Sequence, residues 1–172
     1  MGLRPGRTIR NIERPYTRVS RKVPRKSYVV GVPQPKIHQF ETGNKNGNFN
    51  TLLYLISDDA CQIRSNALEA GRIVAHKFLS QKLGEQNFFM KILLYPHHVL
   101  REKPIATGAG ADRYSQGMAM AFGKPVGTAV QVKKGKKIVA IFTDKNNLEV
   151  AKEALRRFAS KISARTRIVV ES

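Results

Sequence analysis

Two segments of the sequence carry apolar residues at the three- and four-residue spacing of an amphipathic helix. The first is predicted to begin with Ser65 as its N-cap and to end before Gly84. Its predicted inward stripe consists of Ala67, Ala70, Val74 and Phe78. The second follows Asn147 as N-cap and extends to about Ser163. Its predicted inward side is broader and consists of Val150, Ala151, Ala154, Leu155, Phe158 and Ile162.

Shorter apolar runs between turn residues predict strands. The expected strands are residues 27–32, 36–41, 51–57, 88–95, 126–132, 137–143 and 167–170, with 98–101 as a continuation beyond Pro96. Residues 43–48 are expected to form a turn, and residues 133–136 are expected to close a hairpin between 126–132 and 137–143. The pattern predicts an α+β fold, a two-layer sandwich in which two helices pack on a mainly antiparallel sheet.

Two regions show neither the spacing of a helix nor the pattern of a strand. Residues 1–26 contain few apolar side chains and three prolines, so they are expected to form an irregular basic N-terminal arm that becomes ordered on its partner. Residues 101–122 are rich in glycine, and a structureless stretch of that length inside a domain is usually functional or disordered. We therefore expect an arm at 1–26 and a single α+β domain at 27–172 that carries a glycine-rich loop at about 101–122.

Positive charge is concentrated in these two regions. The chain has 31 Lys and Arg against 12 Asp and Glu, a net charge of +19. Residues 1–40 hold ten basic and one acidic side chain and residues 101–137 hold eight and two, whereas residues 41–100 hold six and five. Such a charge would repel itself in a free protein, so we expect a polyanionic partner, above all a nucleic acid. The alternative, an arm that only aids solubility, is disfavoured because most of its cations are arginines, whose guanidinium groups suit phosphate.

An anionic membrane is the second partner that this charge could serve. The sequence has no run of about 18 apolar residues that could cross a bilayer, and no apolar stretch of a secretory signal follows the basic N-terminus. Cys61 is the only cysteine, so the chain can form neither an intrachain disulfide nor a zinc-binding cysteine cluster. We expect a cytoplasmic protein that binds no membrane.

The sequence shows no constellation typical of an enzyme. Residues 108–113, Gly-Ala-Gly-Ala-Asp-Arg, lack the third glycine and the strand–turn–helix frame of a dinucleotide site. Asp58 and Asp59 are interpreted as acids that stabilise the start of the following helix, and Cys61 as a small, partly buried residue rather than a nucleophile. The four histidines are interpreted as packed or surface imidazoles, and no cofactor or metal is expected. The nucleic-acid signals are generic, because Phe88-Phe89 lacks the basic-glycine frame of an RNA-recognition motif; the residues alone leave RNA and DNA open.

Several motifs spread over the chain resemble one family. They are Arg14-Pro15-Tyr16-Thr17-Arg18, Gly31-Val32-Pro33 with Lys36-Ile37, Leu68-Glu69-Ala70 with Arg72, Pro96-His97-His98-Val99-Leu100-Arg101, Gly108-Ala109-Gly110-Ala111-Asp112-Arg113, Gly117-Met118, Ala121-Phe122-Gly123-Lys124-Pro125-Val126-Gly127-Thr128 and Glu153-Ala154-Leu155-Arg156-Arg157. They resemble the universal large-subunit ribosomal protein sixteen family in its archaeal and eukaryotic "L-ten-e" form, over nearly the whole chain. The Gly-Ala-Asp-Arg loop joined to Phe-Gly-Lys-Pro is highly specific. One departure is Ala119, which stands where the family usually has Arg. The end at Ser172, without the extension of eukaryotic members, favours an archaeal source.

The resemblance implies a structural, non-enzymatic component of the large ribosomal subunit in the cytoplasm. Its implied partners are large-subunit ribosomal RNA, tRNA near the peptidyl transferase centre and other large-subunit proteins, and no homo-oligomer is expected. The residues expected to bind ribosomal RNA are Arg4, Arg7, Arg10, Arg14, Arg18, Arg21, Lys22, Arg25, Lys26 and Lys124. Those of the loop expected near tRNA are Arg101, Lys103, Gly108, Gly110, Asp112, Arg113 and Gly117.

Overall fold

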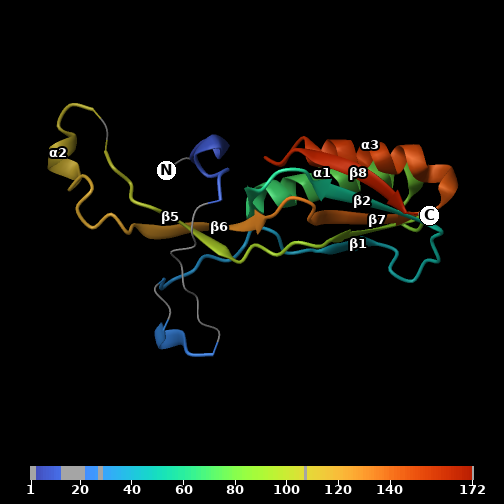
Figure 1. Ribbon diagram of the computed structural model, residues 1–172, viewed down its shortest axis with the longest axis horizontal. Helices are drawn as coiled ribbons and strands as arrows, with labels where there is room; N and C mark the ends of the chain where they lie inside the picture. Colours follow the sequence, from blue (N-terminus) through green and yellow to red (C-terminus); the bar gives the residue numbers. More distant parts are fainter. Residues whose placement is uncertain (1–2, 13–21, 27–28, 107, 172) are drawn as a thin grey trace.

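The computed structural model describes residues 3–12, 22–26, 29–106 and 108–171 (Figure 1). The strands are β1 Glu41–Gly43, β2 Thr51–Ser57, β3 Cys61–Arg64, β4 Phe88–Ile92, β5 His98–Glu102, β6 Lys124–Val132, β7 Lys137–Thr143 and β8 Thr166–Glu171. The helices are α1 Ser65–Leu83, α2 Ala111–Tyr114 and α3 Leu148–Ala159, with 3-10 turns at η1 Gly6–Thr8, η2 Pro24–Lys26 and η3 Lys145–Asn147. This architecture confirms the predicted α+β class.

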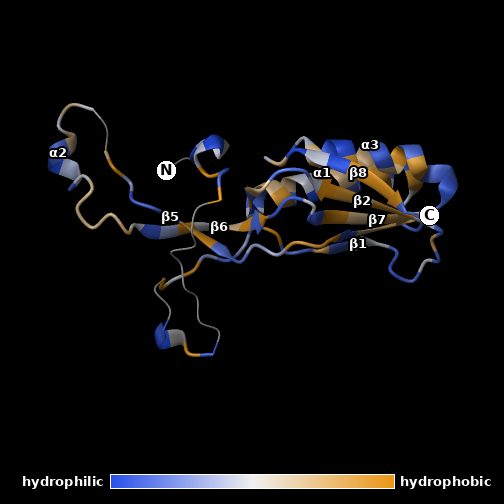
Figure 2. Cartoon of the chain, in the orientation of Figure 1, coloured by the Kyte–Doolittle hydropathy of each residue, from blue (hydrophilic) through white to orange (hydrophobic). Residues whose placement is uncertain are grey.

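A five-stranded sheet in the order β1-β4-β7-β2-β8 forms the centre of the main body, and every pairing in it is antiparallel. Alternate residues of its strands line up across the sheet, so that Leu53 lies opposite Ile141, which lies opposite Met90, and all three are buried. Helices α1 and α3 cover this face (Figure 1). Apolar residues accordingly line the sheet and the inner sides of both helices, while polar residues face outward (Figure 2).

The two long helices approach each other closely at one glycine. A Cβ atom added to Gly71 of α1 would lie 2.9 Å from the ring of Phe158 of α3, so a larger residue would push the helices apart. Phe158 is fully buried there, together with Ala151, Ala154 and Leu155 of the same helix. These four positions confirm the predicted inward side of α3, although the helix ends at Ala159 rather than near residue 163.

The predicted inward stripe of α1 is wrong by one position. The buried residues of this helix are Ser65, Leu68, Gly71, Ala75 and Leu79, whereas Ala67 and Phe78 are only partly buried. The sequence pattern was ambiguous because α1 packs on a sheet on one side and on α3 on the other, which makes its apolar surface broad. Arg64, not Ser65, is the N-cap, and no side-chain hydrogen bond caps this end.

The predicted hairpin between residues 126–132 and 137–143 is also wrong. β6 belongs to a second, three-stranded sheet in the order β3-β6-β5, whereas β7 pairs with β2 and β4 in the large sheet. Residues 133–136 therefore carry the chain from one sheet to the other. The sequence pattern does not predict β3, because this strand has only four residues and lies directly before α1.

The strands expected before β1 are absent from the described part of the chain. Residues 29–40 contain no strand, and β1 begins only at Glu41. Pro33 and Pro35 explain this, since proline has no N–H to donate to a sheet. β4 likewise ends at Ile92 rather than residue 95, and the segment beyond Pro96 joins the other sheet as β5 instead of continuing β4. The predicted turn at 43–48 and the strands β2 and β8 are confirmed.

Candidate nucleic-acid interface

A long antiparallel hairpin of β5 and β6 projects from the main body and carries residues 103–123 at its tip (Figure 1). Arg101 lies opposite Pro125 and Glu102 lies opposite Lys124, so Arg101 and Lys124 belong to the strands rather than to a loop. The tip also contains the short helix α2. The predicted glycine-rich loop at about 101–122 thus lies between the two strands, except that Arg101 and Glu102 belong to β5 and that residues 111–114 form a short helix.

The end of this hairpin depends on a glycine and on a cation–aromatic contact. Gly123 has a φ of +73°, and an added Cβ would lie 2.7 Å from the carbonyl oxygen of Glu102, so only glycine fits. Arg101 lies 3.8 Å above the ring of Phe122 and donates a hydrogen bond of 2.7 Å to the carbonyl oxygen of that residue. The two strands are thus joined beyond the last pair of their ladder.

The predicted tRNA-proximal residues occupy the tip, except Arg101, which lies on β5. Gly110 has a φ of +78° at the N-cap of α2, and Asp112 and Arg113 follow on that helix, both exposed. Gly108 and Gly117 also have positive φ values, of +117° and +57°. The tip exposes several large apolar side chains: Ile105, Tyr114, Met118, Met120 and Phe122. Exposed apolar residues gathered in one region mark an interaction surface.

The first part of the arm docks on the chain's own small sheet. The backbone N–H of Gln62 donates to the carbonyl oxygen of Arg10 at 2.8 Å, and the Gln62 side-chain amide donates to the carbonyl oxygens of Ile9 at 3.1 Å and Asn11 at 2.6 Å. Gln62 lies on β3, the edge strand of that sheet, so the arm provides a hydrogen-bond acceptor for a backbone N–H that the sheet leaves unpaired. The expectation that this segment becomes ordered only on its partner is therefore wrong for residues 3–12.

Ion pairs hold the same segment against the second sheet. Arg4 lies 3.4 Å from a Glu102 carboxylate oxygen, and its carbonyl oxygen accepts a hydrogen bond of 2.9 Å from Arg64. Arg10 lies 3.9 Å from Asp59. Asp59 also pairs with Arg165, and Asp58 pairs with Arg167. Both acids lie in the turn between β2 and β3, so their predicted role at the start of the helix is wrong.

A cavity of about 550 Å³ lies between the docked arm and the small sheet. Its lining includes three cationic residues, Arg4, Lys36 and Arg64, beside the carboxylate of Glu102 and apolar side chains such as Leu3. The cavity brings together side chains from the arm, from the segment around residue 36 and from β5. It adds a concave site, lined mostly by apolar surface but carrying three cations and one carboxylate, between the arm and the hairpin.

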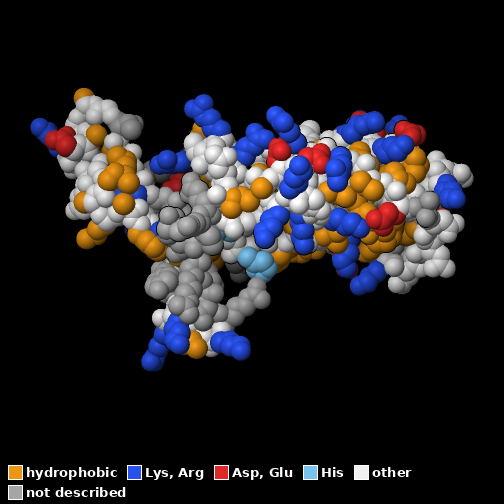
Figure 3. All heavy atoms as spheres, viewed as in Figure 1, with side chains coloured by type: hydrophobic (Ala, Val, Ile, Leu, Met, Phe, Trp, Pro, Cys, Tyr) orange, Lys and Arg blue, Asp and Glu red, His pale blue; other side chains and the backbone are white. Residues whose placement is uncertain are grey.

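The structure groups the predicted RNA-binding residues in four places. Arg4, Arg101 and Lys124 lie around the outer end of the β5–β6 ladder, while Arg113 lies at the tip. Lys22, Arg25 and Lys26 belong to η2 and its flank, a separate protrusion on which Lys and Arg side chains stand out (Figures 1 and 3). Arg7 and Arg10 lie on η1 and beside it. Arg14, Arg18 and Arg21 lie outside the described residues.

A reactive cysteine, a metal-binding cluster or a membrane-spanning helix would indicate a different kind of function. Burial raises the pKa of the Cys61 thiol, which keeps it protonated and weakly nucleophilic. Within the described residues no three His, Cys, Asp or Glu side chains are grouped so that they could hold a metal ion. No helix in that part of the chain is long and apolar enough to cross a membrane.

One set of functional candidates was missed by the sequence prediction. Phe89 of β4 and Phe142 of β7 lie opposite each other, with ring centroids 5.5 Å apart, on the face of the large sheet turned away from its helices. These residues are 53 positions apart in the sequence, and neither lies in a recognised motif. The one available signal is that each phenylalanine lies between buried residues of its strand and so faces away from the core. The sequence does not show that the two strands pair, so it does not predict that the rings meet.

Comparison with known proteins gives a consistent result. The family model described as ribosomal protein L16p/L10e matches residues 14–169. The chain is 48% identical over 171 residues to the large ribosomal subunit protein uL16 of Archaeoglobus fulgidus, covering 99% of this chain and 94% of that protein. It is 49% identical over 170 residues to the protein of the same name from Staphylothermus marinus, covering 98% and 94%. For the Methanococcus aeolicus protein the identity is 47% over 171 residues, covering 99% and 95%.

Proposed function

The chain belongs to the ribosomal protein L16p/L10e family, and from that premise we propose that it binds large-subunit ribosomal RNA and helps to position tRNA near the peptidyl transferase centre. It is a structural component of the large ribosomal subunit in the cytoplasm and is not an enzyme. The family resemblance seen in the sequence motifs is thus confirmed. The RNA contacts and the residues that make them are our proposal.

The distribution of unpaired charge carries this proposal. Lys103, Arg113 and Lys124 on the hairpin have no ion-pair partner among the described residues, although the chain pairs many of its other cations with nearby carboxylates. Cations left without a counterion in a protein of net charge +19 are suited to phosphate oxygens. The glycines of the tip let an RNA backbone approach the chain closely.

We divide the binding surface into two parts. The arm, residues 1–26, supplies arginines to ribosomal RNA, and its docking on β3 fixes where the segment at Arg4 and Arg10 presents them. The domain, residues 27–172, supplies the hairpin, whose tip around Asp112 and Arg113 extends toward tRNA. Docking in advance of binding lowers the entropic cost of the RNA complex, because that part of the arm is already ordered. A single copy of the chain would provide the whole surface, alongside neighbouring large-subunit proteins.

Salt titration tests the proposed mode of binding. If the chain neutralises about six to ten phosphates, its affinity for a large-subunit ribosomal RNA fragment should fall on the order of a thousandfold or more between 50 and 200 mM salt. Filter binding or fluorescence anisotropy at several salt concentrations would measure this slope. An affinity that does not change with salt would contradict an electrostatic interface.

A further inference from the structure

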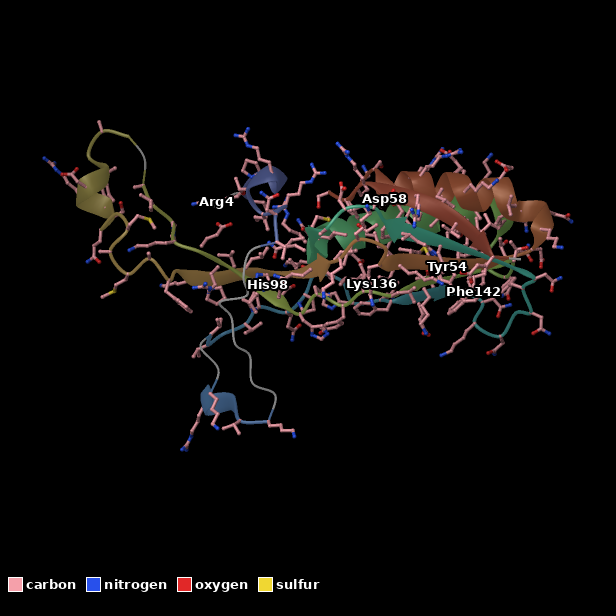
Figure 4. All side chains as sticks on the ribbon, viewed as in Figure 1. Arg4, Tyr54, Asp58, His98, Lys136 and Phe142 are labelled. Carbon is pink, nitrogen blue, oxygen red and sulfur yellow. The ribbon has the colours of Figure 1, made fainter. Side chains whose placement is uncertain are left out.

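The large sheet has one face that its helices leave uncovered. α1 and α3 lie together on the opposite face (Figure 1), and strand register places Leu52, Phe142 and Phe89 in one row across β2, β7 and β4 on the open face. Ile138 on that same face is fully buried, so one end of the face is covered. The end that carries Phe142 remains partly exposed, and Figure 4 shows Phe142 and Tyr54 near each other on their two strands.

A loop at this open end turns the aromatic row into a pocket. Asn44 fixes the loop: its side-chain amide donates to the carbonyl oxygen of Gln86 at 3.2 Å, and its side-chain oxygen accepts from the N–H of Asn46 at 3.1 Å. Phe49 folds back so that a Cβ added to Gly47 would lie 2.6 Å from its ring. The loop thereby holds a third phenylalanine ring beside the sheet.

The pocket has a volume of about 560 Å³ and an unusual set of lining residues. They are Lys45, Gly47, Asn48, Phe49, Asn50, Phe89 and Phe142. Three aromatic rings supply flat π surfaces for stacking, and two exposed amides supply both hydrogen-bond donors and acceptors. This combination of rings and amides suits a flat heteroaromatic ring with polar edges, which describes a nucleobase.

The charges around the pocket favour a phosphate-bearing occupant. Lys45 and Lys91 share one carboxylate, that of Glu41, at 3.2 and 2.7 Å, which leaves one excess positive charge at this edge of the sheet. Lys45 keeps 72% of its side chain exposed and can swing to a phosphate. An apolar side chain of a partner protein would cover the two asparagine amides without offering them hydrogen bonds, at a cost in desolvation.

We propose that this pocket binds one unpaired nucleobase of an RNA strand, stacked on the Phe89–Phe142 pair beside Phe49, with a neighbouring phosphate held by Lys45. The proposal rests on the proposed RNA-binding function and adds a base-binding site on the side of the body away from α1 and α3. It differs from the arm and the hairpin in kind, because those bind through charge, whereas this pocket requires a base.

Two matched single-stranded ligands separate the contribution of base stacking from that of the phosphates. The full chain is titrated with a short single-stranded RNA and with an abasic ribose-phosphate chain of the same length, and fluorescence anisotropy at fixed salt gives both dissociation constants. Both ligands carry the same phosphates, so the dissociation constant for the abasic chain divided by that for the RNA measures the contribution of the bases. Stacking is worth about 1–3 kcal/mol per base, so losing this site should reduce that ratio roughly 5- to 150-fold. Phe89→Leu and Phe142→Leu, alone and together, are expected to reduce it in this way while affinity for the abasic chain stays the same.

Two variants control for indirect effects. Phe142→Tyr keeps an aromatic ring at the same position and should retain the wild-type ratio. Phe78→Leu makes the same change on α1, on the other side of the sheet, where Phe78 packs under Arg157, and should also retain it. A wild-type ratio near one, or an unchanged ratio in the Phe89→Leu/Phe142→Leu variant, overturns the pocket. Binding to both ligands that remains salt-dependent in that case would leave the proposed function standing.

Cross-linking in assembled large subunits identifies the occupant directly. A photoreactive benzoylphenylalanine is introduced at position 142, and the subunits are irradiated after purification. An adduct with ribosomal RNA supports the proposal. An adduct with another protein means that the open face is a protein-docking surface, and it overturns the base-binding pocket.

Discussion

The main body and the hairpin use charged side chains in different ways. On the helices of the body, cations lie beside carboxylates of the same helix: Arg72 is 2.6 Å from Glu69, Lys152 is 2.8 Å from Glu149, and Arg157 is 3.1 Å from Glu153. On the hairpin, Lys103, Arg113 and Lys124 have no such partner among the described residues. Pairing within one helix is thus a feature of the body, although Lys77 and Lys82 of α1 also have no ion-pair partner among the described residues. The hairpin differs in carrying three such cations on one short segment.

Apolar side chains differ between the two regions in the same sense. The body buries its large residues, among them Phe88, Phe158 and Leu155, at or below 1% exposure. The hairpin tip exposes 85% of Tyr114 and 87% of Met120. We therefore expect the stability of the isolated protein to reside in the body, and the hairpin to be free for the binding role proposed above. Three experiments test this division.

The largest effect is expected in the core. Phe158→Ala should lower the free energy of unfolding by about 3–5 kcal/mol, because it removes a fully buried ring between α1 and α3 and leaves a cavity. Tyr114→Ala removes a similar ring at the hairpin tip and should leave stability within about 0.5 kcal/mol of wild type. Urea unfolding followed by circular dichroism measures both. Equal losses in the two variants would mean that the tip packs on the body.

A smaller effect is expected from removing the unpaired charges. Lys103→Ala, Arg113→Ala and Lys124→Ala together should lower affinity for ribosomal RNA on the order of tenfold to a hundredfold, and should reduce the salt slope by about three. The melting temperature should stay nearly unchanged, because exposed charges contribute little to folding.

The matched control for that variant removes three cations from the body: Lys152→Ala, Arg156→Ala and Lys161→Ala, on α3 and just after it. Its RNA affinity should change far less than that of the hairpin variant. If both triple variants lose affinity equally, binding depends on total charge, and the hairpin has no special part in it.

The smallest effect concerns the ion pairs of α3. Hydrogen bonds from Lys152 and Arg157 hold the pKa values of Glu149 and Glu153 below their ordinary value of 4.5. Because the folded pKa values are lowered, the stabilisation is fully present above about pH 4.5 and is lost as the pH falls through the lowered values. The melting-temperature difference between wild type and Glu149→Gln/Glu153→Gln should be small and constant from pH 7 to about pH 5, and should shrink below that. At 1 M salt the difference should decrease at every pH, and persistence there would exclude a charge effect.

The sequence by itself determined the elements whose period is local. The residue spacing along α3 specified its buried side, and the apolar run at 51–57 specified β2, because both patterns follow from the geometry of one segment. The motifs around Gly108–Arg113 and Phe122–Pro125 likewise indicated the family, which the comparisons confirm. Net charge and its unequal distribution pointed to a polyanionic partner for the same reason, since charges can be counted without knowing the fold.

Tertiary structure decided everything that depends on which segments meet. β6 and β7 are neighbours in sequence yet belong to different sheets, because pairing partners far along the chain competed successfully for each strand. The arm's docking depends on the edge of β3, and this strand of four residues is too short to show an alternating pattern in the sequence. Phe89 and Phe142 became a pair only when β4 and β7 aligned in register. Local periodicity is contained in the order of residues, whereas strand partners and register are set by the packing free energy of the whole chain.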